Sequence, residues 1–431
     1  MTAGIGSRKL VVAVAMLAAP GIGTADAQTR SAGEFPPRNS ARAEVETPVA
    51  LRTAAPGSRW YASGEYLLWQ VKGAPLSVPL VSTGPNVVER AGWITSPDVT
   101  ILYGAPGGAA AGGNDTQQFP WGSGARVKLG YWLDDAQRMA IEAGGFLLAQ
   151  RSAGFAMSSD ASGSPVINVP VNNTILYSPI PGFFTFPGEN GYPPALPGQL
   201  AGAISINNTL RLFGAEAAGV VTLQRSPGWH VSALIGARYL DLYERFDLWA
   251  TSAGVPGSRF VGLSGSVSDL FETQNHFLGL MLGLHGGTSW GPFSIEATGR
   301  VAFGGNYKQL TVAGAYTSVN FPNAGMNSGP YGIFAQPANS GSFSSTDFAI
   351  VPEAQVKLGY DLTPSLRLSV GYDFLYISDV IRPGDQLNHS LPKGQIFQQG
   401  GSATSLTSPT PLFERTNFYA HGFNVGLTAR F

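Results

Sequence analysis

The sequence contains no cysteine among its 431 residues. Without thiols the chain can form no disulfide, no thiolate nucleophile and no cysteine-ligated zinc site, and it offers no cysteine for lipidation at a mature amino terminus. Charge is also scarce, because Asp, Glu, Lys and Arg make up 12% of the residues and the formal net charge is -1. No basic stripe exists that could neutralise phosphates, which argues against nucleic acid as a partner.

Long apolar runs are missing too. The apolar stretch 10–19 follows the basic pair 8–9 and precedes a small-x-small pattern at 25–27. About ten apolar residues are too few for a membrane-spanning helix, which needs about twenty. The pattern predicts a cleaved signal peptide over residues 1–27 and an exported protein, the alternative being a buried core helix. Residues 28–58 are rich in Pro, Ala, Arg and Ser without periodicity, which predicts a disordered periplasmic tail.

The last fourteen residues, 418–431, alternate strictly between two faces. Apolar residues such as Phe423 and Leu427 occupy one face, and small or polar residues such as Gly422 and Asn424 occupy the other. This period of two belongs to a β-strand. A long final strand with a small, polar inner face and a terminal Phe is typical of bacterial outer-membrane barrels.

Nine further segments show the same alternation. They are 60–71, 125–133, 139–151, 209–223, 229–243, 275–285, 293–303, 348–360 and 366–376. The connections alternate between long Gly- and Pro-rich segments and tight turns, the outer-membrane arrangement, and only closure satisfies the backbone of a sheet in lipid. We therefore predict that residues 59–431 form an all-β, antiparallel transmembrane β-barrel of about ten strands, with short periplasmic turns, long extracellular loops and both termini in the periplasm. Loop segments such as 201–207 could add strands and raise the number to twelve.

Aromatic residues gather at the strand ends, as in the two girdles of a membrane barrel. On the short-turn side they are Trp60, Trp132, Trp229, Trp290, Tyr360 and Phe431, and on the loop side Trp69, Tyr243, Phe348, Tyr376 and Tyr419.

Several segments resemble a known family. They are Glu65-Tyr66-Leu67-Leu68-Trp69, Lys72-Gly73-Ala74-Pro75-Leu76, Gly130-Tyr131-Trp132-Leu133-Asp134, Gly236-Ala237-Arg238-Tyr239-Leu240-Asp241-Leu242, Gly371-Tyr372-Asp373-Phe374-Leu375-Tyr376 and Val380-Ile381-Arg382-Pro383-Gly384-Asp385. In this order they are similar to the bacterial family beta-barrel porin-7. The resemblance implies a porin-like outer-membrane barrel whose substrate is not established, and it supplies no catalytic residues.

Charged residues on the predicted inner faces are the candidate functional set. They are Glu65, Arg126, Lys128, Glu142, Glu216, Arg238, Glu296, Arg300, Glu353, Lys357, Arg367, Asp373 and Arg430. Both signs occur and nearly cancel, so one interpretation is a lumen closed by ion pairs, as in small barrels filled by side chains. The other is a narrow pore that orients small polar solutes. The turns place Glu216 diagonally across from Arg238, and Lys128 diagonally across from Glu142.

Glu353 and Asp373 are expected to lie directly opposite each other. Two facing carboxylates repel unless a base or a cation lies between them. Lys357 could supply the base, and a cation site is the alternative hypothesis.

The histidines give little sign of catalysis. Four of them, His230, His276, His285 and His421, fall near strand ends, where an amphipathic ring suits a membrane interface. His389 lies in a loop near Asp385, a pair with which a barrel-borne hydrolase could begin, but no convergent nucleophile accompanies it.

Two loop segments are rich in aromatic residues, 183–186 and 331–334. A loop of this kind could fold inward as a constriction or form an extracellular contact surface.

From these features we expect an integral protein of the bacterial outer membrane, porin-like, that lets small polar solutes diffuse passively through a charge-lined lumen. The alternative is a structural or adhesive surface barrel with an occluded lumen, and a hydrolase comes third. We expect no enzyme activity, cofactor or metal. The expected partners are outer-membrane lipid, small polar solutes or ions, and the barrel-assembly machinery, which would bind the strand ending at Phe431.

Overall fold

The computed structural model describes residues 59–85, 91–173, 188–320, 325–391 and 409–431. The predicted signal peptide and periplasmic tail lie outside these ranges. Across the described part of the chain, no helix combines the length and apolar character that crossing a membrane requires.

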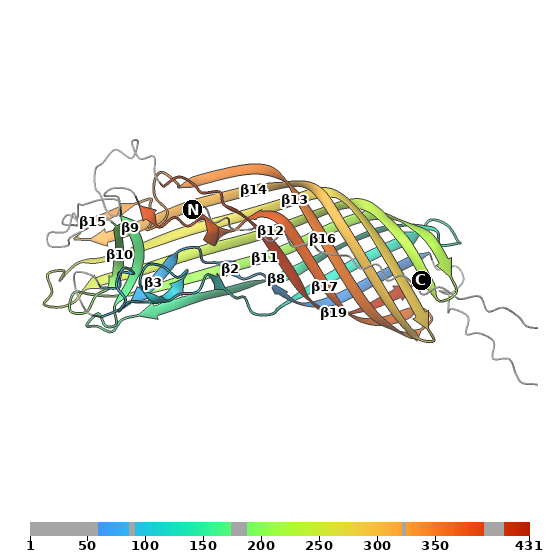
Figure 1. Ribbon diagram of the computed structural model, residues 1–431, viewed down its shortest axis with the longest axis horizontal. Coiled ribbons are helices and arrows are strands. Elements are labelled where there is room, and N and C mark those ends of the chain that lie inside the picture. The colour runs from blue at the N-terminus through green and yellow to red at the C-terminus, as the bar shows by residue number, and fades with distance from the viewer. Residues whose placement is uncertain (1–58, 86–90, 174–187, 321–324, 392–408) are drawn as a thin grey trace, which may run out of the picture. The chain divides into compact units, whose positions relative to one another are not determined.

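Ten antiparallel strands of the described chain close into a ring (Figure 1). Their order around the ring is β13-β12-β11-β8-β7-β1-β19-β17-β16-β14, and β14 pairs with β13 to complete it. The bounds are β1 (Trp60–Val71), β7 (Gly122–Trp132), β8 (Met139–Ser158), β11 (Leu200–Ser226), β12 (Trp229–Gly254), β13 (Ser264–Trp290), β14 (Phe293–Val319), β16 (Gly341–Thr363), β17 (Leu366–Ile381) and β19 (Arg415–Arg430).

The first and last strands of the ring pair with each other. Their register runs from Tyr61 opposite Arg430 to Val71 opposite Ala420. The terminal Phe431 exchanges two backbone hydrogen bonds of 2.9 Å with the first residue of β1. The predicted ten-strand barrel is therefore confirmed. The alternative of twelve strands is wrong, because residues 201–207 continue β11 rather than forming a strand of their own.

Short turns join alternate pairs of strands, as expected. In the turn between β7 and β8 the Asp134 carboxylate accepts hydrogen bonds from the backbone amides of Arg138 (2.7 Å) and Met139 (3.0 Å). These amides hold the pKa of Asp134 below its ordinary value. The carboxylate thereby satisfies two backbone donors that the turn would otherwise leave open.

The outer face of the ring is apolar and exposed. Val127, Leu278 and Leu284 are 64%, 63% and 58% exposed, an arrangement that suits contact with lipid rather than water. The girdle prediction fails for two residues. Trp69 is fully buried inside the ring, and Trp132 packs against an interior cluster at the short-turn end, because both share the inward-facing parity of their strands.

Strands β11 to β14 are much longer than a membrane requires. They contain 26 or 27 residues each, whereas about 9–11 residues suffice for a tilted transmembrane strand. At about 3.3 Å per residue such a strand measures roughly 90 Å. The wall formed by these strands therefore continues well beyond the apolar band on the loop side.

A smaller sheet packs against the inner face of this extended wall. Its strand order is β10-β9-β3-β4-β5, with β18 pairing beside β9. The bounds are β3 (Pro79–Thr83), β4 (Thr100–Gly104), β5 (Ala111–Gly112), β9 (Ile167–Asn173), β10 (Gly188–Ala195) and β18 (Ser390–Leu391); β2 (Ala74–Pro75) pairs with β6 (Thr116–Gln117), β15 (Met326–Gly329) extends the edge of β14, and η1 (Pro383–Gln386) is one 3-10 turn.

Candidate functional site: the filled lumen

The inward side chains follow a fixed order along the long strands. On β12, Arg238 is followed by Leu240 and Leu242, then by Glu244, and then by Phe246. The neighbouring strands β11 and β14 place charged, apolar, polar and apolar side chains in the same succession, and β13 shares the apolar, polar and apolar part of it. The lumen is therefore filled by four stacked layers, which we call the charged, inner apolar, polar and outer apolar layers, counted from the short-turn end.

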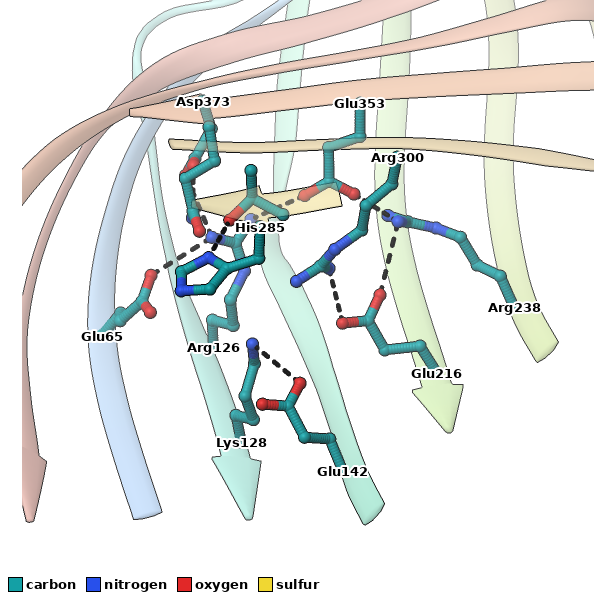
Figure 2. A network of polar contacts seen from close by, with 12 residues as sticks. Glu65, Arg126, Lys128, Glu142, Glu216, Arg238, His285, Arg300, Glu353 and Asp373 are labelled. Atoms are coloured by element: carbon teal, nitrogen blue, oxygen red, sulfur yellow. Dashed lines mark hydrogen bonds and ion pairs between the residues drawn. The ribbon is translucent and has the colours of Figure 1, made fainter. Parts of the chain in front are cut away.

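The charged layer is a continuous network of ion pairs (Figure 2). Arg126 lies among three carboxylates, at 3.1 Å from Glu65, 3.2 Å from Asp373 and 3.7 Å from Glu353. Asp373 also accepts hydrogen bonds from the side-chain amide of Gln355, at 2.6 Å. One guanidinium thus joins strands from both ends of the chain.

A second centre of this layer is Glu216. Its two carboxylate oxygens accept hydrogen bonds from Arg238 at 3.3 Å and Arg300 at 2.6 Å. Arg238 also pairs with Glu353, which connects this centre to Arg126. Figure 2 shows these side chains pointing toward one another across the ring.

The remaining predicted lumen residues pair nearer the short-turn end. The pairs are Lys128–Glu142 at 3.3 Å, Lys357–Glu65 at 2.5 Å, Arg367–Glu296 at 2.5 Å and Arg367–Asp361 at 2.6 Å. Arg430 lies close enough to Arg367 and Glu296 to interact with both electrostatically. All thirteen predicted residues therefore face the lumen, and the network supports the interpretation of paired charges.

The predicted register needs two corrections. Asp373 lies opposite Gln355, whereas Glu353 lies opposite Leu375 on one side and Arg300 on the other. The prediction that Glu353 and Asp373 face each other directly was wrong, because the turn after β16 carries a register shift. Glu216 lies directly opposite Arg238, not diagonally.

No cation is needed at Glu353 and Asp373, because basic side chains already neutralise both carboxylates. Both carboxylates have Arg126 as a neighbour, and Lys357 binds Glu65. Across the described residues there is no group of three or more His, Asp or Glu side chains that could hold a metal ion.

A cavity of about 390 Å³, part of it open to solvent, lies in the charged layer. Its lining includes Glu65, Arg126, Glu216, Arg300 and Glu353. Each charged side chain around it is paired with at least one opposite charge.

The inner apolar layer closes the ring above the charges. Leu67, Trp69, Leu148, Leu212 and Phe277 have exposed fractions of 0 or 1%. They come from four different strands and belong to one buried cluster. Water does not reach these side chains, although each points into the lumen.

Arg382 dominates the polar layer. Its guanidinium is fully buried and binds the Glu244 carboxylate at 2.5 and 2.8 Å. It also donates to the carbonyl oxygens of Gly73 at 2.6 Å and Lys72 at 3.3 Å, and it lies over the ring of Phe418. Arg382 therefore ties β12, β19 and the segment after β1 together across the lumen.

The turn after Arg382 is closely packed against that segment. A Cβ added to Gly384 would lie 1.7 Å from the carbonyl oxygen of Pro75. We expect Gly384→Ala to lower the free energy of unfolding by about 1–3 kcal/mol, because the backbone must shift to relieve the overlap. Urea titration followed by tryptophan fluorescence measures this change. Gly64→Ala is the control, since nothing lies within 4 Å of its added Cβ; equal effects of the two substitutions would contradict the prediction.

The outer apolar layer joins the extended wall to the smaller sheet. Tyr103 on β4 accepts a hydrogen bond of 3.0 Å from the side-chain amide of Asn208 on β11. Burial raises the pKa of the Tyr103 hydroxyl, which therefore stays protonated near neutral pH. The inserted sheet is fixed to the wall by such contacts as well as by apolar packing.

One of the aromatic loops folds inward. Ile333 and Phe334 are fully buried in the outer apolar layer. The Asp269 carboxylate on β13 accepts hydrogen bonds from the backbone amides of Ile333, Phe334 and Ala335 at 2.7 to 3.1 Å. The prediction of an inward constriction is confirmed for segment 331–334, whereas segment 183–186 lies outside the described residues.

The histidines divide between the two faces. His276 and His421 face outward and bind Tyr239 and Tyr372 at 2.9 and 2.6 Å. His285 faces inward and contacts Thr298 at 2.9 Å, so the expected interface position is wrong for this residue.

The predicted hydrolase pair is fixed by other contacts. Asp385 accepts a hydrogen bond from the Ser77 hydroxyl at 2.7 Å. The backbone carbonyl of His389 accepts one from the amide of Asn172 at 2.7 Å. These contacts hold the loop in place and give no geometric support for a catalytic pair.

Residues 61–431 match the model of the family described as beta barrel porin-7. The chain belongs to this family. It is a porin-like barrel of the outer membrane. No curated protein matches the sequence.

Several solved structures are similar to this chain at low identity. The outer membrane protease OmpT from Escherichia coli has 10% identity and a TM-score of 0.39, with 88% of this chain and 98% of that chain covered. The Pseudomonas putida toluene transporter TodX has 8% identity and a TM-score of 0.20, with 87% and 90% covered. A Pseudomonas aeruginosa FadL homologue has 8% identity and a TM-score of 0.20, with 86% and 90% covered. At these TM-scores the likeness carries no inference about activity or substrate.

Sequence reasoning missed the polar layer. Arg382 and Glu244 were not among the candidates, because Arg382 lies beyond the expected end of β17 and Glu244 beyond that of β12. The signal was present in the segments 72–76 and 380–385, which carry the family resemblance and turn out to contact each other.

Proposed function

We propose that this barrel is occluded along its axis and serves as an outer-membrane anchor for the β-structure on its loop side. The observation that carries the proposal is the inner apolar layer, in which side chains from strands around the ring are shielded from water. A hydrated solute passing along the axis would have to give up its water at this layer.

The cost of dehydrating a solute favours a closed lumen. Moving an unpaired polar group from water into an apolar environment costs roughly 2–7 kcal/mol. Among the apolar residues that form the inner apolar layer, only the buried indole N–H of Trp69 could donate a hydrogen bond to replace the lost water, and the outer apolar layer repeats the obstacle. Passive diffusion of small polar solutes therefore requires displacement of the packed interior.

Solute uptake tests this function. We expect liposomes containing the refolded barrel to show no swelling in isotonic arabinose beyond that of empty liposomes, and no stepwise ion conductance in planar bilayers. A general outer-membrane porin in the same liposomes controls for reconstitution. Rapid swelling would overturn the proposal and support passive diffusion of small polar solutes through the charge-lined lumen.

The partners proposed for this function follow from the outer surface. The apolar face contacts outer-membrane lipid, and the strand ending at Phe431 is the segment that we propose the barrel-assembly machinery binds. Both termini then lie in the periplasm and the extended wall lies outside the cell. Peptide hydrolysis by the purified barrel that His389→Ala abolishes would instead favour a hydrolase.

A further inference from the structure

The neighbouring strands β16 and β17 stop pairing with each other before either strand ends. Pairing of β16 with β14 extends to the start of β16, and pairing of β17 with β19 extends to the end of β17. The pairs between β16 and β17 end at Glu353 opposite Leu375. Residues 347–352 and 376–381 therefore continue side by side without a backbone ladder, and we call this gap in the ladder the seam.

The sequence explains where the ladder ends. Pro352 comes directly before the last paired residue and has no amide hydrogen to donate. The next amide along the seam, that of Ile350, donates to the side-chain hydroxyl of Ser378 at 2.9 Å. The Ser378 hydroxyl here takes the place of a backbone carbonyl, because a backbone amide in contact with lipid must have a hydrogen-bond partner.

Ion pairs hold the seam on its inner side. Lys308 on β14 is fully buried and contacts Asp379 on β17 at 2.5 Å and Asp347 on β16 at 2.9 Å. Arg415 on β19 contacts Asp347 at 2.9 Å. The two edges of the seam are joined by these contacts between side chains, which can separate without unravelling either strand.

The seam divides two apolar regions. On the outside, Phe348 and Ile350 are 66% and 37% exposed on the lipid-facing side of β16. On the inside, Ala349, Val351 and Ile377 are at most 2% exposed and belong to the inner apolar layer. Only the thickness of the wall separates the outer leaflet from the apolar interior at this point.

We propose that the seam is a lateral gate through which small, uncharged apolar molecules dissolved in the outer leaflet reach the barrel interior. Apolar side chains lie on both sides of the seam beside Ile350 and Val351, and its charged groups are already paired with one another, so such a molecule need not enter water. A charged or strongly polar molecule would lose its hydration there without compensation. The gate is independent of axial closure, because it concerns the wall and not the stack of layers.

Cysteine labelling tests the gate cleanly, because the natural chain has no cysteine. Ala349→Cys places a thiol behind the seam. Ala302→Cys is the matched control: both alanines have 0% exposure and lie in the inner apolar layer, but Ala302 lies on β14, which pairs continuously on both sides. Each variant is reconstituted in liposomes and treated with N-phenylmaleimide or with a sulfonated, charged maleimide.

We expect N-phenylmaleimide to modify the thiol at position 349 severalfold faster than the thiol at 302, and the charged reagent to modify neither. Adding Ser378→Ala, which removes the acceptor of the Ile350 amide, should raise the rate at 349 and leave that at 302 unchanged. Heat-modifiable gel mobility confirms that each variant is folded. Equal rates at 349 and 302, or equally fast modification of 349 by the charged reagent, would overturn the lateral gate.

Discussion

Replacing Arg382 by methionine is expected to lower the free energy of unfolding by about 3–5 kcal/mol, because it leaves the Glu244 carboxylate buried without its charged partner. The substitution also removes the donors to Gly73 and Lys72, which fix the segment after β1. Urea titration monitored by heat-modifiable gel mobility measures the loss.

Two control variants test whether the loss of stability comes from the Arg382–Glu244 pair rather than from removing any buried arginine. Arg151 is also buried, at 6% exposure, but among the described residues its side chain donates only to the backbone of Trp69. Arg151→Met should therefore change the stability far less. Arg382→Met combined with Glu244→Leu should recover much of the stability, since replacing a buried ion pair by apolar residues is often neutral. Failure of the double variant to recover would show that the backbone contacts of Arg382 dominate.

Replacing Arg126 by methionine is expected to have an effect of similar size, about 3–5 kcal/mol or more, because three buried carboxylates lose a common partner. Glu65 keeps Lys357 and Glu353 keeps Arg238, whereas Asp373 keeps only amide donors from the described residues. Most of the loss should therefore arise at Asp373.

A double-substitution cycle checks this assignment. Asp373→Asn in the Arg126→Met background should restore part of the lost stability, and it should restore more than Glu65→Gln in the same background. Arg245→Met is a surface control, because Arg245 pairs with Asp247 on the exposed outer face and such pairs contribute about 0–1 kcal/mol. An equal gain from both rescuing substitutions would contradict a special role for Asp373.

The strand pattern of the barrel could be predicted from the sequence because lipid outside and side chains inside impose a period of two on every strand. The segment 60–71 even has the bounds of β1. Strands β11 to β14 were predicted too short. Beyond the membrane their outer faces become polar, as at Arg245 and Asp247, and the apolar period on which the prediction rested disappears there.

The sequence also predicted which charged side chains point into the lumen, but it did not predict which residues they pair with. Parity along a strand places Glu353 inside, yet pairing with Arg126 and Arg238 depends on how strands distant in sequence are staggered around the ring. Trp69 shows the same limit. Its parity pointed inward, but its aromatic character favoured a girdle position, and only the packing with Phe146 decides between them.

The pairing of the first strand with the last has a consequence for biogenesis. Arg126 is made early, whereas its partners Glu353 and Asp373 belong to the final quarter of the chain. While the polypeptide is still emerging, Arg126 has Glu65 but lacks its two later carboxylate partners, and one edge of β1 has no neighbour. We expect a chain truncated before β19 to remain an open sheet that chaperones must shield, because the strand that cyclises the sheet is missing.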